Sequence, residues 1–240
     1  ACRDWGVFEL VGHGIPDSVI SGILTAMAGF FAQSSAGKEQ LRRTEANPWG
    51  YYDSELTKNT RDWKEVYDYG PADGVALVPQ LPSGLPGFQR AVDDYYEHCE
   101  RVSLGLLSAI ATNLGVTSDS LARGFRPDHT SFLRLNYYPP CAEPGQPTHT
   151  GPTESKHLGI NPHTDAGAMT VLLHDRQSGL QVYREGEWHT VVVGEGSIVI
   201  NIGDIVQVWS NDRYPAPLHR VLANLTAERY SAPFFFNPAY

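Results

Sequence analysis

The second half of the chain constrains the fold most, because it is a succession of short apolar runs separated by turns rich in Gly, Asp and Pro. Short strands at such close spacing predict an antiparallel double-sheet core, the double-stranded β-helix or jelly roll, with helices packed outside it. The predicted fold class is therefore mainly β with flanking helices. The expected strands are Phe132–Tyr138, Ala168–His174, Leu180–Tyr183, Trp188–Val193, Ser197–Ile202, Ile205–Trp209, Leu218–Ala223 and Tyr230–Phe236.

The first half of the chain has a different pattern. Residues 5–11 read as a strand that ends at a Gly-rich turn. Apolar residues then recur at helical spacing from Asp17 to Phe31, and again from residue 87 to Leu114, where Gly115 supplies a stop. Residues 44–85 are rich in Pro, Gly and Asn with scattered Trp and Tyr, which favours ordered loops with aromatic anchors.

We expect one domain over residues 1–240, with a mostly helical and looped support region at 1–130 and the jelly-roll core at 131–240. The chain begins inside an expected strand, so an N-terminal segment of the domain is expected to be missing. The long loop at residues 142–157 carries His149 and His157, which we interpret as solvated loop residues, and its length suggests a lid.

Composition narrows the class of partner. Eighteen Lys and Arg stand against 27 Asp and Glu, a formal net charge of −9, whereas nucleic acids and anionic membranes select for basic faces. No apolar stretch reaches the roughly 20 residues of a membrane span. The three Cys residues are far apart, and no signal-peptide pattern is present. We therefore expect a cytoplasmic monomer that acts on a small molecule.

A histidine and a carboxylate stand at metal-ligand spacing in His163-Thr164-Asp165. On an extended segment both side chains point to the same side, so they can bind one ion together. His219, on a later expected strand, is well placed to be the third ligand. Two His and one carboxylate leave open positions on an octahedral ion, as in non-haem Fe(II) oxygenases. Taken alone, this spacing is a weak signal, because isolated histidines usually lie on the surface or in the core.

The last expected strand adds a second feature. Arg229 and Ser231 share one face of it, and the following apolar residues 232–236 favour burial. A buried guanidinium needs an anion, and a guanidinium beside a hydroxyl is suited to hold a carboxylate. The alternative is a surface ion pair at the end of a strand.

With these features in place, the chain resembles the plant-type 2-oxoglutarate- and Fe(II)-dependent dioxygenases, the family that includes isopenicillin N synthase. The resemblance implies that His163, Asp165 and His219 bind Fe(II), that Arg229 and Ser231 hold the distal carboxylate of 2-oxoglutarate, and that Asn136 and Tyr138 line the co-substrate site. It also implies O2-dependent oxidation of an unactivated C–H bond of a small organic molecule, with release of succinate and CO2. The matching segments are Asp4-Trp5-Gly6-Val7-Phe8, His13-Gly14-Ile15-Pro16, Leu135-Asn136-Tyr137-Tyr138-Pro139-Pro140-Cys141, His163-Thr164-Asp165-Ala166-Gly167, Asn201-Ile202-Gly203-Asp204, Trp209-Ser210-Asn211-Asp212 and Arg229-Tyr230-Ser231.

Further residues are candidates for contact with substrate. Phe235 lies on the same strand face as Arg229, and we weigh a substrate contact against core packing. Arg134 lies two residues before Asn136 on the same expected strand, so its side chain should point to the same inward side. There it would meet a polar substrate group or form a structural ion pair. In the segment 61–65 we expect Trp63 to buttress the pocket and the charged residues to be solvated. Asn201 and Asp204 are expected to serve turn geometry.

Three other functions stay open at this stage. The first is an oxidase of the isopenicillin N synthase type, in which Arg229 and Ser231 bind the carboxylate of the substrate itself. The second is a non-enzymatic metal-binding protein. A zinc hydrolase is a weaker alternative, because no general-base carboxylate lies near the triad in sequence. The Asn136-Tyr137-Tyr138 segment resembles the 2-oxoglutarate users, which favours the dioxygenase.

Overall fold

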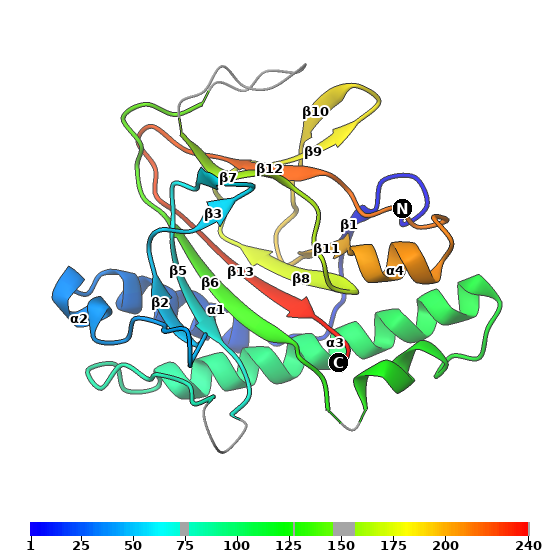
Figure 1. Ribbon diagram of the computed structural model, residues 1–240, viewed down its shortest axis with the longest axis horizontal. Coiled ribbons are helices and arrows are strands. Elements are labelled where there is room, and N and C mark those ends of the chain that lie inside the picture. The colour runs from blue at the N-terminus through cyan, green and yellow to red at the C-terminus, as the bar shows by residue number, and fades with distance from the viewer. Residues whose placement is uncertain (73–76, 127, 146–156, 240) are drawn as a thin grey trace.

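Two antiparallel sheets face each other in the computed structural model, which describes residues 1–72, 77–126, 128–145 and 157–239 (Figure 1). The larger sheet has the strand order β1-β11-β8-β13-β6-β5-β2, and the smaller has the order β10-β9-β12-β7. The predicted jelly-roll core is confirmed. The strands are β1 (Val7–Leu10), β2 (Gly50–Tyr52), β3 (Leu56–Thr57), β4 (Thr60–Arg61), β5 (Glu65–Tyr69), β6 (Phe132–Tyr138), β7 (Leu158–His163), β8 (Met169–His174), β9 (Leu180–Arg184), β10 (Glu187–Thr190), β11 (Ile198–Ile202), β12 (His219–Leu222) and β13 (Arg229–Phe236).

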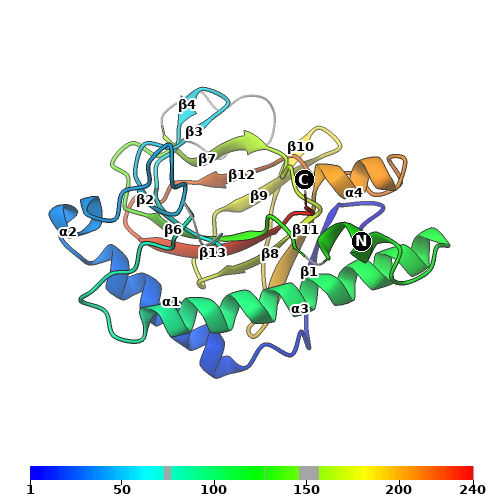
Figure 2. The same ribbon diagram turned by 60° about the horizontal axis from the view of Figure 1, so that its bottom comes forward.

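Helices cover the outer face of the larger sheet, on the side away from the smaller one (Figure 2). The long helix α3 (Phe88–Leu114) contacts β8 and β13, and α1 (Asp17–Phe31) packs beside it. Both were predicted from apolar spacing. Helix α3 ends where Gly115 adopts φ +83°, a left-handed conformation that suits glycine at this position. The remaining helices are α2 (Ser35–Glu39), the short 3₁₀ helix η1 (Leu121–Phe125) and α4 (Asp204–Trp209).

Period-2 alternation along the central strands separates two interiors. On β13, Ala232, Phe234 and Phe236 join the core between the sheet and the helices, whereas Arg229 and its alternate neighbours line a cavity between the two sheets. Strand β6 pairs with β13 in register and divides its side chains in the same way. The central strands therefore place one face in a hydrophobic core and the other in a mixed polar cavity.

Two predictions about elements are wrong. Residues Ile205–Trp209 form helix α4 and not a strand, because Gly203 caps the segment and the backbone N–H of Asp204 is bonded to the carbonyl of Asp165 (2.8 Å). The apolar run is too short for its periodicity to separate the two structures. Residues 44–85 are not only loops, since β2 and β5 extend the larger sheet. Strand β5 is buried on both faces, so it lacks the alternation that marks a half-buried strand.

Strand β7 was not predicted as a strand. Pro162 lies inside it, and a proline normally argues against a strand. The structure accommodates this residue because β7 is an edge strand of the smaller sheet and its register with β12 shifts between Ile160 and His163, an irregularity of the kind at which proline is tolerated. Within the expected loop 142–157, His149 lies outside the described residues. His157 is exposed, and its ring lies 4.7 Å from that of Trp63.

Two further structural features concern the cysteines and the helices. All three cysteines, Cys2, Cys99 and Cys141, are free. Within the described ranges, every helix is too short or too polar to cross a membrane.

Candidate metal centre and adjoining cavity

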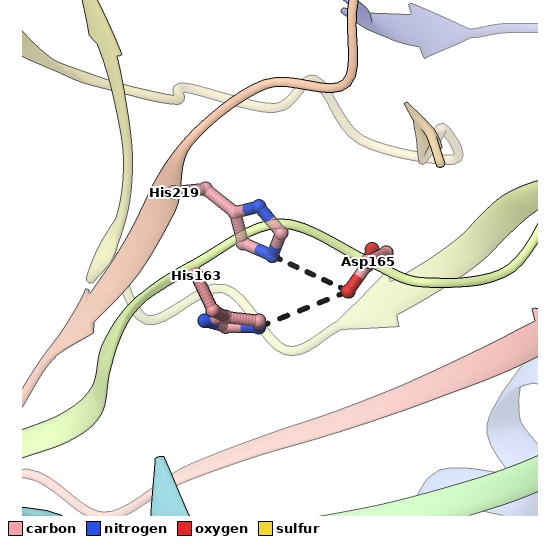
Figure 3. Close-up of side chains that lie close together, drawn as sticks. All are labelled: His163, Asp165 and His219. Atoms are coloured by element: carbon pink, nitrogen blue, oxygen red, sulfur yellow. Dashed lines mark ion pairs between the residues drawn. The ribbon is translucent and has the colours of Figure 1, made fainter. Parts of the chain in front are cut away.

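Two paired strand ends bring His163, Asp165 and His219 together. His163 is the last residue of β7 and His219 the first of β12, and the two are register partners in the antiparallel pair. Asp165 follows β7 by two residues. Figure 3 shows the three side chains converging, with the Nε2 atoms of His163 and His219 at 3.7 Å and 3.6 Å from Oδ1 of Asp165. One potential ligand atom from each residue lies within 4.8 Å of the others, a spacing at which the three can share one ion.

Backbone carbonyls fix the orientation of both imidazole rings. Nδ1 of His163 lies 2.8 Å from the carbonyl oxygen of Asn161, and Nδ1 of His219 lies 3.0 Å from that of Pro217. A carbonyl only accepts, so each Nδ1 carries the proton and donates. The lone pair of each Nε2 is therefore directed to the shared centre, the usual arrangement of metal-bound histidines.

Asp165 is oriented in a similar way. Its Oδ2 accepts hydrogen bonds from Thr170 Oγ1 (2.7 Å) and Asn201 Nδ2 (3.4 Å), which leaves Oδ1 for the centre. Burial opposes ionisation of this carboxyl, but His219, His163 and these hydrogen bonds outweigh it and lower its pKa. Asp165 is thus held as an anion.

The charge state of His163 suits the same role. Burial, reinforced by the neighbouring His219, lowers the pKa of His163 below its ordinary value. A neutral imidazole is the form that binds a metal ion.

A second polar group lies deeper between the sheets, on β13 and β6. Arg229 is paired in register with Tyr138, and Ser231 with Asn136. The Ser231 hydroxyl lies 3.3 Å from both the Asn136 amide nitrogen and the Tyr138 hydroxyl. These four side chains form a compact group at neighbouring positions of two strands.

Arg229 is only 1% exposed and is incompletely paired. Its Nε donates to the carbonyl of Gln177 (3.3 Å) and its guanidinium lies 4.9 Å from the Tyr138 ring centroid, but Nη1 has no hydrogen-bond partner among the described residues. Burying a guanidinium without an anion is costly. The group therefore has the character of a site for an anionic ligand.

One cavity of about 290 Å³ connects the two groups. Apolar side chains from both sheets, including Leu172, Leu180 and Val221, form its wall near Arg229. Toward the other end it is lined by larger and charged side chains, namely Phe132, Phe235, Arg134, Glu55 and Lys64.

The two candidate substrate contacts, Phe235 and Arg134, both line this cavity. The Phe235 ring lies 4.8 Å from that of Phe132 across the β13–β6 pair. Arg134 binds Asp68 through Nε (2.6 Å) and Nη2 (2.8 Å), and Glu55 through Nη1 (2.9 Å). The structure thus gives Arg134 the ion pairs that were one of its two expected roles.

Sequence reasoning missed several residues around the centre. Asn201 is not a turn residue, because it lies on β11 and bonds Asp165. Thr170 makes the shorter bond to the same carboxylate. A signal was present, because each is a polar residue within an otherwise apolar strand. Asp62 and Lys64 are buried and not solvated, contrary to expectation.

Comparison with known proteins agrees with this geometry. The model of the 2OG-Fe(II) oxygenase superfamily matches residues 129–238, and that of the N-terminal region described as "non-haem dioxygenase in morphine synthesis" matches residues 1–81. A crystal structure of JOX2 in complex with 2OG, Fe and JA superposes with a TM-score of 0.85 and 31% identity, over 100% of this chain and 69% of that one. The rice dioxygenase for auxin oxidation gives a TM-score of 0.74 and 26% identity, over 99% of this chain and 75% of that one.

Curated sequences give the same result. Jasmonate-induced oxygenase 2 of Arabidopsis thaliana is 32% identical over 99% of this chain and 63% of its own length. Gibberellin 20 oxidase 2 of Oryza sativa subsp. indica is 34% identical over 99% of this chain and 61% of its own length. The chain thus spans about three fifths of these relatives. It belongs to the 2-oxoglutarate- and Fe(II)-dependent oxygenase superfamily, as the sequence motifs predicted.

The residues present fit the two groups that bind in this family. Two imidazoles and one carboxylate are a donor set suited to Fe(II) with open coordination positions. The unpaired Nη1 of the buried Arg229 fits a carboxylate of 2-oxoglutarate.

Proposed function

We propose that this protein is an oxygenase that uses Fe(II), 2-oxoglutarate and O2 to oxidise a C–H bond of a small organic molecule. The observation that carries the proposal is one cavity lined by two groups suited to ligands, the donor set of His163, Asp165 and His219 for a metal and the buried, incompletely paired Arg229 for an anion. Two such groups in one cavity match the bound groups of the family and are not needed for folding.

The three metal ligands have distinct roles in this proposal. His163 and His219 supply neutral nitrogen donors whose rings are held by backbone carbonyls. Asp165 supplies the only negative charge of the set, and Thr170 and Asn201 keep its second oxygen occupied. The bound iron then supplies the O2-dependent oxidation, with 2-oxoglutarate converted to succinate and CO2.

The rest of the cavity orients the co-substrate and excludes water. We propose that Arg229 and Ser231 bind the distal carboxylate of 2-oxoglutarate, while Asn136 and Tyr138 line its site. The aromatic face of Tyr138 supports the guanidinium, and Asn136 Oδ1, which lacks a partner among the described residues, is available to a bound group or water. The apolar wall limits the water that competes for these polar atoms.

For the substrate we propose a small organic molecule that enters beside Phe235. Its ring and that of Phe132 offer apolar surface at the charged end of the cavity, and Arg134 with its carboxylate partners forms the wall. The outcome can be hydroxylation, desaturation, demethylation or oxidative cyclisation. We further propose a cytoplasmic monomer. The acidic net charge of −9 disfavours nucleic-acid and anionic-membrane partners.

Coupled turnover tests the proposal. Anaerobically purified protein is supplied with Fe(II), O2 and 2-oxoglutarate, and succinate release is measured against a screen that begins with jasmonates, gibberellins and auxins, the compounds in the names of its relatives. We expect at least one small molecule to raise succinate release. Oxygen consumption with a substrate but without 2-oxoglutarate would support an oxidase of the isopenicillin N synthase type. Metal binding without any oxygen consumption would instead support a non-enzymatic metal-binding protein.

A further inference from the structure

The segment before β5 covers the open edge of β7, the strand that ends at His163. An edge strand presents unpaired backbone groups along one side, and proteins commonly cover them. Here the Trp63 N–H donates to the carbonyl of Leu158 (2.8 Å), and the Asn161 N–H donates to Oδ1 of Asp62 (3.0 Å). This contact joins the larger sheet, which contains β5, to the smaller sheet beside the metal centre.

Asp62 is the principal side chain in this contact. It is 2% exposed and accepts from both nitrogens of Asn161, the backbone N–H and Nδ2 (2.9 Å), through the same oxygen, Oδ1. Its other oxygen accepts from Thr57 Oγ1 (2.7 Å) and lies 3.3 Å from Nζ of Lys64. So many contacts on one buried carboxylate fix its position and that of Asn161.

Asn161 in turn orients the metal ligand. Its carbonyl oxygen is the acceptor for His163 Nδ1 at 2.8 Å. The residue between them is Pro162, whose ring fixes its own φ and restricts Asn161 to extended backbone. A displacement of the Asn161 backbone therefore also displaces the carbonyl that orients the His163 imidazole.

His219 provides an internal comparison. Its Nδ1 also bonds the carbonyl two residues before it, that of Pro217. However, β12 lies inside the smaller sheet, between β9 and β7, and is held by strand neighbours on both sides. Strand β7 has such a neighbour on one side only. On its other side, Trp63 and Asp62 bond it, and Asp62 is the one that bonds next to His163, at Asn161.

Lys64 balances the charge of Asp62. The side chains of both residues are almost fully buried, 3% and 0% exposed. Burial, together with the nearby Arg134, lowers the pKa of Lys64, but the ion pair with Asp62 opposes this shift. Without Lys64 the anion would be buried with only neutral donors, and without Asp62 the cation would be left unpaired.

We propose that Asp62 is a positioning residue for the metal centre, which holds His163 in its ligating orientation through Asn161. The inference rests on the proposed function, since the centre it serves is the Fe(II) site. It concerns metal affinity and coordination geometry, and Asp62 itself does not touch the metal ligands.

Metal binding in a set of charge-neutral variants tests this inference. The first variant, Asp62→Ala with Lys64→Met, removes the acceptor without leaving a buried charge. We expect its dissociation constants for Fe(II) and Co(II) to rise about 10-fold, the lower end of the usual effect of losing a direct outer-sphere partner, because the carbonyl of Asn161 remains but is less firmly held. The visible absorption of bound Co(II) should also change, because it reports the arrangement of the ligands.

A second variant separates position from charge. Asp62→Asn with Lys64→Gln keeps an amide oxygen that can accept from both nitrogens of Asn161. We expect metal affinity within about threefold of the wild type and an unchanged Co(II) spectrum, because a neutral acceptor retains most of the hydrogen bonding.

The Lys38–Glu65 pair provides a matched control. It is another Lys–carboxylate pair, with Lys38 buried on α2 and Glu65 partly buried at the start of β5, and Nζ and Oε2 are 2.5 Å apart. Neither residue belongs to the covering contact on β7. Lys38→Met with Glu65→Leu should lower the melting temperature of the metal-free protein but leave both metal dissociation constants unchanged.

The outcomes distinguish this inference from the proposed function. If the first variant binds Co(II) with wild-type affinity and spectrum, Asp62 does not position the ligand and the inference is wrong. The same holds if the control variant weakens metal binding equally, because the effect is then general loss of stability. If the wild-type protein itself binds no Fe(II), the proposed function fails.

Discussion

The two ends of the cavity differ in how their charged groups are satisfied. At the inner end, each polar side chain is held by neighbours at one atom and turns another toward a ligand site. Nε2 of both histidines faces Oδ1 of Asp165 at 3.7 Å and 3.6 Å, and Nη1 of Arg229 has no hydrogen-bond partner among the described residues. At the outer end, Arg134 and Arg43 are each bonded to both Asp68 and Glu55, so two cations meet two anions.

This difference indicates which charges are there for a ligand. A charged group that is oriented but incompletely paired is a cost to folding unless something binds it. A closed network of two arginines and two carboxylates needs nothing further, and it serves to shape the wall. The comparison predicts large losses of ligand binding at the inner end and losses of stability at the outer end.

The largest effect is expected at Asp165. Asp165→Ala removes the only anionic ligand, so we expect Fe(II) binding and 2-oxoglutarate turnover to be abolished while the protein remains folded. Anaerobic metal titration and succinate release measure the two quantities. Wild-type activity in this variant would exclude the assigned metal centre.

Arg229→Ala should affect the co-substrate and spare the metal. Losing a buried charge-assisted contact typically costs 2–5 kcal/mol, so the dissociation constant for 2-oxoglutarate should rise by about two orders of magnitude. Affinity for Fe(II) alone should be unchanged. An unaltered 2-oxoglutarate requirement would instead support binding of a substrate carboxylate at Arg229.

At the outer end, Arg134→Met should mainly reduce stability. It leaves Asp68, which is 3% exposed, with Arg43 as its remaining cationic partner, and breaking such a buried pair costs about 3–5 kcal/mol. Urea unfolding measures the change. Arg176→Met, which breaks the exposed pair with Glu195, serves as the control and should have no measurable effect. A loss of 2-oxoglutarate affinity without loss of stability in Arg134→Met would contradict the comparison.

The smallest effect is a pH dependence of stability from Glu55. Burial raises its pKa, but Arg134, Arg43 and Lys64 outweigh burial, so the folded pKa lies below the ordinary value of 4.5. As pH falls below that value, the unfolded state takes up the proton first. The stabilisation is therefore complete above the ordinary pKa and is lost as pH falls through the folded pKa. Between about pH 6 and about pH 3, Glu55→Gln should flatten the decline in the free energy of unfolding. If the free energy of unfolding declined with falling pH as steeply in Glu55→Gln as in the wild type, Glu55 would not contribute to the pH dependence of stability.

The sequence predicted the parts of the site that follow from strand periodicity. The alternation from Arg229 to Phe235 placed one set of side chains on a common face, and the structure lines the cavity with that set. The spacing of His163 and Asp165 likewise predicted side chains on one side. In both cases the relevant distance is a few residues along an extended chain, and local geometry determines it.

The parts that the sequence could not supply depend on pairing across the fold. Asp62 and Lys64 lie in a polar, charged segment that resembles a solvated loop, and only the edge of β7 shows why they are buried. The same applies to β5, whose place beside β6 is set by partners far away in sequence. Pro162 obscured β7 because its tolerance depends on the position of the strand within the sheet.

The central claim is that one cavity holds a metal and a 2-oxo acid together, and an anaerobic titration tests it most directly. Metal-free protein is titrated with Fe(II) and then 2-oxoglutarate, and the weak visible charge-transfer band of a chelated keto acid is followed. We expect the band in the wild type and, at the same 2-oxoglutarate concentration, its loss in Arg229→Ala. Iron binding without a band in the wild type would contradict the account.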